Sequence, residues 1–171
     1  MARPATRPNE VWTCDFIHDR TVSGGSLKWL SGVDEYTREV LPLDAAGTMT
    51  AVDVRRRMGR LAGWRGRLAR LRCDNGGEFV GRALAEWPAG RGVELTPVAA
   101  ASLWQNGYAE SFHSRRRDEF LNGTRFENVA DAPARAGCFK RRDNEQRPQS
   151  AMNYLTPKAF AARCGVKAEM N

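Results

Sequence analysis

The pattern of apolar and polar positions predicts three strands at the start of the chain. Val11–His18 is a short, mostly apolar run of the kind that forms a buried strand, and it contains Asp15. The turn sequence SGGS at 23–26 follows, and further runs of this kind lie at Leu27–Val33 and Glu39–Leu43. Because short connections join antiparallel neighbours, we expect these strands to form an antiparallel meander.

The period of the pattern then changes, and helices alternate with short strands. A helix is expected at 48–61, ended by the sequence GWRG at 63–66, with its apolar side formed by Met49, Val52, Met58 and Leu61. The later elements are expected in this order: a strand at Leu68–Cys73, a helix at Glu78–Trp87, a strand at Gly92–Val98, and helices at Trp104–Leu121 and Arg125–Arg142. The tail at 147–165 is expected to turn at Pro148 and Pro157.

This order of elements is typical of a single mixed α/β domain. The 171 residues contain no internal repeat and supply enough apolar material for one core. We expect a flexible lead-in at residues 1–9, the folded core at residues 10–165 and a short C-terminal tail at residues 166–171.

Charge indicates a polyanionic partner. The formal net charge is +7, the sequence pI is about 9.7, and most of the excess is arginine, which forms bidentate contacts with phosphate. A biased base composition of the source genome would produce the same excess of arginine. The sequence has no apolar run of membrane-spanning length, no signal peptide and no CxxC spacing, so we expect a cytoplasmic protein whose four cysteines are reduced.

Three separated carboxylates are the candidate chemistry. Asp15 lies in an apolar strand, Asp74 ends the strand of the phrase LRCDNGGEF, and Glu110 lies within the helical phrase WQNGYAESF, with 35 residues between Asp74 and Glu110. Each has an ordinary structural explanation when taken alone: a loop cap, a turn residue and a solvated helix residue, respectively. Taken together, a strand centre, a strand end and a facing helix can bring hard oxygen ligands to one site for divalent metal ions.

The helix around Glu110 supports this hypothesis. Asn106, Glu110 and Ser114 follow one another at intervals of four and therefore share one helical face. Tyr108 flanks that face, and three successive arginines, Arg115, Arg116 and Arg117, follow it. We interpret these residues as candidate DNA contacts beside the metal site; a solvated charge run is the alternative. Arg141, Arg142 and Arg147 would extend the same basic track, whereas residues 55–57 suit a solvated face or a dimer contact.

The chain resembles the catalytic core of insertion-sequence transposases of the retroviral-integrase-like DDE superfamily. The resemblance covers about residues 8–162 and rests on RPNEVWTCDF, VDEYTRE, DNGGEF, QNGYAESF, RRDEFLN and RPQSAMNYLTP, together with the 35-residue spacing. It implies an RNase H-like α/β fold: a five-stranded mixed sheet, three strands antiparallel and then two parallel, with helices on both faces.

The resemblance also implies an activity and its partners. It assigns Asp15, Asp74 and Glu110 as ligands of two Mg²⁺ (or Mn²⁺) ions for phosphodiester hydrolysis and strand transfer. The implied partners are DNA, both element ends and target, and at least one further copy of the chain on that DNA. A helix-turn-helix region, upstream or on a separate protein, is expected to recognise the element ends. The expected site of action is the bacterial cytoplasm, at the nucleoid, with no membrane partner.

Some positions depart from the family pattern. Residues 100–103 read AASL where the family usually has a loop like Pro-Gly-Ser-Pro, and Gln149 stands where histidine is usual. These departures keep two alternatives open: a catalytically silent or truncated remnant that only binds DNA or a partner transposase, and a nuclease without strand transfer.

Overall fold

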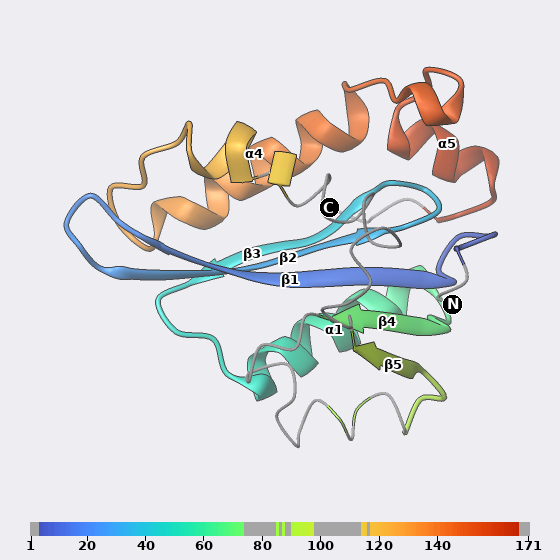
Figure 1. Cartoon of the computed structure of the whole chain (residues 1–171), viewed down its shortest axis with the longest axis horizontal. Coiled ribbons are helices and arrows are strands. Elements are labelled where there is room, and N and C mark those ends of the chain that lie inside the picture. The colour runs from blue at the N-terminus through green and yellow to red at the C-terminus, as the bar shows by residue number, and fades with distance from the viewer. Residues whose placement is uncertain are drawn as a thin grey trace.

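A five-stranded mixed sheet forms the centre of the molecule in the computed structural model (Figure 1), which describes residues 4–73, 85, 87, 90–97, 114–115 and 117–167. The strands lie in the order β3-β2-β1-β4-β5. Their bounds are Val11–Arg20 for β1, Ser26–Asp34 for β2, Val40–Ala46 for β3, Arg70–Cys73 for β4 and Glu94–Pro97 for β5.

Strand directions agree with the predicted topology. β1 pairs antiparallel with β2, and β2 pairs antiparallel with β3, which confirms the meander. β1 then pairs in parallel with β4, and β4 pairs in parallel with β5. The strands thus follow the predicted sequence of three antiparallel and then two parallel. The crossover from β3 to β4 runs through helix α1 (Ala51–Arg65).

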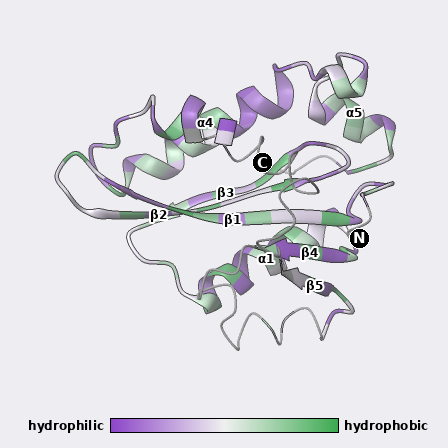
Figure 2. Cartoon of the chain, viewed as in Figure 1, coloured by the Kyte–Doolittle hydropathy of each residue, from purple (hydrophilic) through white to green (hydrophobic). Residues whose placement is uncertain are grey.

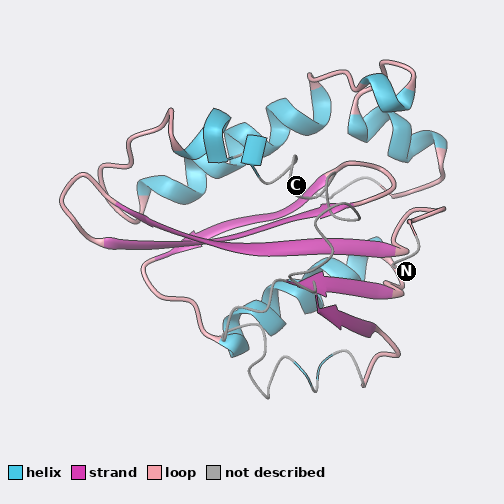
Figure 3. Ribbon diagram, viewed as in Figure 1, coloured by secondary structure: helices cyan, strands magenta, loops and turns pink. Residues whose placement is uncertain are grey.

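Helices cover both faces of the sheet (Figure 3). Helix α1 lies on one face, and helices α4 (Asp131–Glu145) and α5 (Pro157–Arg163) lie on the other. Each face carries its own apolar cluster. Trp12, Cys14 and partly buried Phe16 belong to the cluster of the α1 side, and Ile17 belongs to the cluster of the α4 side with Phe120 and Phe139. Successive residues of β1 therefore point to opposite layers, as strand geometry requires.

Helix α1 differs from its prediction at both ends. Thr50 caps the N-terminus in a capping box with Asp53, so that the helix begins at Ala51. Val52 is 46% exposed, so its predicted place on the apolar side is wrong. The buried residues of the helix are Val54, Met58, Leu61 and Arg65. The helix also continues past Gly63, whose added Cβ would meet nothing within 4 Å, and ends at Gly66, which has a φ of 107°.

The C-terminal helices also differ from their predictions. Helix α4 begins six residues later than expected because Pro133 occupies its first turn, where the missing backbone N–H is not needed. At its other end, Asn144 donates to the carbonyl of Val40 at 2.9 Å and accepts from its N–H at 2.8 Å. Helix α4 is thereby fastened to the edge strand β3. The turn predicted at Pro157 is wrong, because this proline starts helix α5 behind the N-cap residue Thr156.

Two predicted helices lie largely outside the described residues. Of the helix expected at Glu78–Trp87, only residues 85 and 87 are described, and both are helical. Of the helix expected at Trp104–Leu121, residues 114 and 115 are helical and Arg117–Leu121 forms the π-helical turn η1. A short 3₁₀ turn, η2, spans Ser150–Met152. Within the described part of the chain, no helix has the length and apolar character needed to cross a membrane.

Candidate active site

Asp15 occupies the middle of the sheet. It lies in β1 opposite Ser31 of β2, and it is half-buried. Its neighbour Cys14 pairs with Cys73, the last residue of the parallel strand β4. Since alternate residues of β1 share a face, Asp15 lies on the same side of the sheet as Thr13 and Ile17, the side that α4 covers.

The other two candidate ligands lie outside the described residues. Asp74 follows Cys73 directly in the sequence, and Glu110 belongs to the segment 98–113. Among the residues that the structure describes, no group of three His, Cys, Asp or Glu side chains is placed to hold a metal ion. The structure therefore places Asp15 alone of the predicted triad.

A charged cluster occupies the sheet next to Asp15. Arg72 of β4 lies beside Thr13 of β1, and its Nη1 donates to Oε1 and Oε2 of Glu35 at 2.8 and 3.0 Å. The Thr13 hydroxyl donates to Oε1 of the same carboxylate at 2.5 Å. The Arg72 and Glu35 side chains are only 10% and 11% exposed, so the pair is shielded from water and retains more of its attraction than a surface pair.

A second ion pair lies one step further back on the same strand. Arg70 Nη2 donates to Glu10 Oε1 at 2.9 Å. Glu10 also accepts from the backbone N–H and the hydroxyl of Thr6, and these bonds together with Arg70 lower its pKa to about 2. Figure 2 shows β4 largely in the hydrophilic colour, although it lies inside the sheet. Ion pairing is what makes so polar an inner strand tolerable.

Acidic residues of the phrase VDEYTRE also form buried contacts near the first residues of β1. Asp34 is fully buried and accepts from the backbone N–H of Asn9 at 2.8 Å, while Arg65 of α1 lies 3.6 Å from the same carboxylate. Arg65 also donates to Glu39 and, at 3.2 Å, to the side-chain oxygen of Asn9. One buried guanidinium therefore joins α1, the chain before β1 and the β2–β3 turn.

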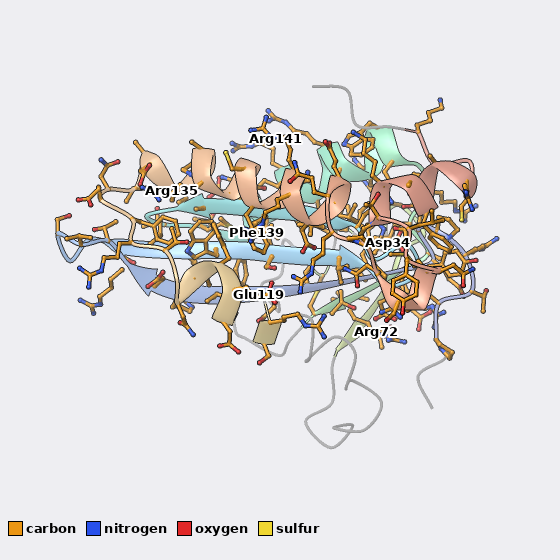
Figure 4. The ribbon with its side chains drawn as sticks, turned by 90° about the horizontal axis from the view of Figure 1, so that it is seen from above. Asp34, Arg72, Glu119, Arg135, Phe139 and Arg141 are labelled. Carbon is orange, nitrogen blue, oxygen red and sulfur yellow. The ribbon has the colours of Figure 1, made fainter. Side chains whose placement is uncertain are left out.

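The predicted DNA contacts are only partly described. Ser114 and Arg115 are exposed. Arg117 begins η1, while Asn106, Tyr108 and Arg116 lie outside the described residues. Arg141 and Arg135 are both exposed on α4 (Figure 4).

Arg147 is engaged with acidic side chains. It donates to both carboxylate oxygens of Glu119 in η1 and lies 3.5 Å from Asp143. These partners raise its pKa and offset its charge within the predicted basic track.

Comparison with known proteins decides the family. A model of the integrase core domain matches residues 5–102, and a second model, also described as an integrase core domain, matches residues 91–157. The chain belongs to the integrase core domain family. The first match alone spans more than half of the chain, and together they span Asp15, Asp74 and Glu110.

Similar proteins come from bacterial insertion elements. The chain is 40% identical over 156 residues to an uncharacterized 31.7 kDa protein of insertion element IS407 from Burkholderia multivorans, covering 91% of this chain and 56% of the relative. It is 33% identical over 158 residues to an uncharacterized 39.2 kDa protein of IS476 from Xanthomonas euvesicatoria, covering 92% and 46%. The resemblance to insertion-sequence proteins with an integrase-like core is confirmed. The chain spans about half the length of these relatives.

Solved structures with this fold include retroviral integrases. A chain of the simian T-cell lymphotropic virus intasome in complex with a PP2A regulatory subunit superposes with a TM-score of 0.75 at 14% identity, covering 94% of this chain and 56% of that one. The catalytic core of BIV integrase gives 0.67 at 16% identity, covering 92% and 96%. The HTLV-2 integrase catalytic core in complex with magnesium gives 0.61 at 15% identity, covering 91% and 97%. These likenesses confirm the RNase H-like fold.

Sequence reasoning missed two charged residues of this integrase core domain, Glu35 and Arg72. A signal was present for Arg72, since it lies two residues before Asp74 in the predicted strand, where alternate residues share a face. Glu35 lies in the phrase VDEYTRE, but its place beside Arg72 follows from the pairing of β1 with both β2 and β4.

Proposed function

We propose that this chain is the catalytic core of an insertion-element transposase, which hydrolyses a phosphodiester bond at an element end and transfers the freed strand to target DNA. Asp15, Asp74 and Glu110 are its metal ligands in this proposal. The observation that carries it is the parallel register of β1 and β4: Cys14 pairs with Cys73, and each is followed directly by an aspartate. Two aspartates thus follow a paired position on adjacent parallel strands.

Asp15 fits a divalent hard cation. Its carboxylate offers the oxygen donors that Mg²⁺ and Mn²⁺ prefer, and its half-buried position keeps it accessible from the α4 side of the sheet. A related fold, the HTLV-2 integrase catalytic core, was solved in complex with magnesium. A pair of such ions would supply Lewis acidity for an in-line displacement at phosphorus.

The protein's own part in the proposed reaction is to hold the ligands and the DNA. β1 holds the backbone of Asp15 opposite Ser31 of β2, one residue beyond the last described pair of β1 with β4, Cys14 with Cys73. Exposed Ser114 and Arg115 are proposed to contact phosphates, together with Asn106, Tyr108, Arg116 and Arg117. The net charge of +7 supports a DNA partner, and we propose the nucleoid of the bacterial cytoplasm as the site of action.

A partner copy and a recognition domain belong to the same proposal. The HTLV-2 integrase core was solved in dimeric and trimeric forms, and we propose that this chain also works as a dimer or larger assembly on DNA. We propose that a helix-turn-helix region, upstream or on a separate protein, recognises the element ends.

The test is Mn²⁺-dependent cleavage and joining of a duplex that carries the ends of the element. Asp15→Asn and Asp74→Asn are each expected to lower nicking and strand transfer by at least about a thousandfold, because a neutral amide holds a divalent ion poorly. Asp19→Asn is the matched control, since Asp19 lies further along β1 on the same face as Asp15. It is expected to keep activity within about twofold of the unchanged chain.

The products separate the candidate functions. Joined products that vanish in both variants support the transposase, and nicks without joined products indicate a nuclease. DNA binding with neither product, at any Mn²⁺ concentration, supports the silent remnant, which the sequence AASL at 100–103 favours. Undiminished activity of Asp74→Asn would contradict the proposed metal site.

A further inference from the structure

The ion pair of Arg72 and Glu35 lies on the same face of the sheet as Asp15. Thr13 and Asp15 are two residues apart in β1 and point to the same side, and Arg72 lies beside Thr13. The rise of a strand places side chains two residues apart at about 7 Å from each other. Figure 4, viewed from the α4 side, shows Arg72 on this face near the end of β4.

Each partner of this pair is held by more than one bond. Glu35 receives two bonds from Arg72 Nη1 and one from the Thr13 hydroxyl, while its own backbone N–H donates to the carbonyl of Val11 at 3.0 Å. The guanidinium is therefore oriented toward Glu35 by a carboxylate whose own position is fixed. At about 10% exposure, water screens the two charges poorly.

We infer that Glu35 is a positioning residue for the metal site: it holds the Arg72 guanidinium in a neutral pair beside Asp15, so that this buried cation does not oppose the binding of a divalent ion there. This inference rests on the proposed function, because it takes Asp15 as a metal ligand. It gives Glu35 of the phrase VDEYTRE a role in metal binding in addition to its buried contacts.

Removing the charge of Glu35 and removing the charge of Arg72 should have opposite effects on the affinity for a divalent ion. Replacing Glu35 by a neutral residue removes one negative charge from the face on which Arg72 lies beside Thr13, two positions before Asp15 in β1, and so weakens the binding of a divalent ion there. Replacing Arg72 by a neutral residue removes one positive charge from the same face and so strengthens that binding. A unit charge at roughly 10 Å in a poorly screened region changes a binding constant by about tenfold. A pair that served stability alone would lower the melting temperature in both variants and shift metal affinity in neither.

The experiment measures Mn²⁺ binding to the full chain without DNA, by electron paramagnetic resonance of free Mn²⁺ or by calorimetry. Glu35→Gln is expected to weaken binding by about tenfold, Arg72→Gln to strengthen it by about threefold to tenfold, and the double variant to return to within about twofold of the unchanged chain. Circular dichroism confirms that each variant is folded under the conditions of the titration.

The chain offers a matched control pair on the same strand. Arg70 and Glu10 form an ion pair of the same kind, at 2.9 Å and with side chains 19% and 13% exposed, but two residues further from the end of β4. Glu10→Gln is expected to leave Mn²⁺ affinity within about twofold, because the charge lies further from Asp15. If Glu35→Gln does not fold, Arg72→Lys replaces it: it keeps the positive charge and is expected to bind Mn²⁺ as the unchanged chain does, in contrast to Arg72→Gln.

The outcomes separate this inference from the proposed function. Shifts of opposite sign for Glu35→Gln and Arg72→Gln, with recovery in the double variant, support it. Shifts of the same sign, or shifts no larger than that of Glu10→Gln, overturn it while the metal site stands. If the unchanged chain binds no Mn²⁺ at a site that Asp15→Asn removes, the proposed function fails and this inference fails with it.

Discussion

Cys73 lies in the sheet one residue before Asp74, and its thiol is well shielded. It is 3% exposed, and burial raises its pKa to about 12. Cys14, its partner across the parallel pair, is 2% exposed. Cys138 and Cys164 are exposed, the first on α4 and the second at the end of α5. The four free thiols therefore fall into two classes that differ in access to solvent.

We expect only Cys138 and Cys164 to react rapidly with a thiol reagent at about pH 8, because burial shields Cys14 and Cys73 from the reagent and raises the pKa of Cys73. Absorbance of the released chromophore would show two fast equivalents and two more after denaturation. Cys138→Ser should remove one fast equivalent. A third fast equivalent in the native chain would contradict the buried positions of Cys14 and Cys73.

The sequence alone marks Asp15 as a candidate site residue, but it does not show which side chains lie beside Asp15. An aspartate within an apolar strand is costly unless it is paired or binds a cation, so a single local pattern marks it. Glu35 and Arg72 are 37 positions apart, and the bond between them depends on how three strands align. No rule of local spacing predicts such a contact.

The turn η1 is joined to the end of α4 by an ion pair between two separate motifs. Glu119 of RRDEFLN accepts two bonds from Arg147 of RPQSAMNYLTP. Phe120, the next residue in η1, packs against Phe139 of α4 with ring centroids 4.6 Å apart. The apolar contact and the ion pair together fix the position of η1 against α4 (Figure 4).

We expect Glu119→Gln to lower the free energy of unfolding by about 1 kcal/mol near neutral pH, a modest value because both side chains are more than a third exposed. The bonds from Arg147 lower the pKa of Glu119 below its ordinary 4.5. Its stabilisation is therefore complete above about pH 4.5 and is lost as the pH falls through the lowered pKa. Urea unfolding of both chains at several pH values measures the difference.

Arg135→Gln is the control for this ion pair. It breaks the contact of Arg135 with Asp131 at 2.8 Å, four residues apart within α4. A pair within one helix joins no separate segments, so we expect a loss of only about 0.3 kcal/mol. An equal loss in Arg135→Gln and Glu119→Gln, with the same dependence on pH, would show that the pair does not fasten η1 to α4.

At the scale of elements, sequence predicted which segments are helical better than where they end. Gly63 was expected to end α1, but the solvent-facing side of a helix tolerates a glycine, and the helix continues until Gly66 adopts a positive φ. Pro157 was read as a turn, yet proline is equally suited to the first position of a helix behind a capping threonine. Tertiary contacts and caps, more than composition, set these boundaries.

The whole molecule carries a strong positive charge on a small surface. The net charge of +7 belongs to a chain of 171 residues. Some of its arginines are already paired with acidic side chains, including Arg65, Arg70 and Arg72 within the sheet layer. These buried pairs leave phosphate contact to exposed arginines, among them the proposed contact Arg115.

We expect the chain to bind a duplex of unrelated sequence with strong dependence on salt. Contact with about four phosphates gives a logarithmic slope near −3.6, so the dissociation constant should rise roughly a hundredfold between about 50 and 200 mM salt. Fluorescence anisotropy with a labelled duplex measures it, and a repeat in EDTA serves as the control because phosphate contacts need no divalent ion. Binding that does not change with salt would contradict an interface made of charges.

The arrangement of the whole sheet was predictable from sequence once the family resemblance was recognised. The three N-terminal strands followed from their pattern and turn, since neighbours in sequence are neighbours in space. The place of β4 beside β1 instead requires a crossover that skips β2 and β3, and local patterns do not encode that step. It is this step that brings Arg72 beside Thr13.

Alternate side chains of β1 face opposite sides of the sheet, and substitutions at them are therefore constrained in two different ways. Trp12, Cys14 and Phe16 belong to the apolar cluster on the α1 side of the sheet. A change in their volume must be compensated by other residues of that cluster. Thr13 and Asp15 point to the other side, where Thr13 donates to Glu35 and where the proposed metal ligand Asp15 lies. Alternate letters of the phrase WTCDF should therefore vary independently among descendants of this chain. A designer could rebuild the even-numbered positions to change stability without altering the face that carries the proposed site.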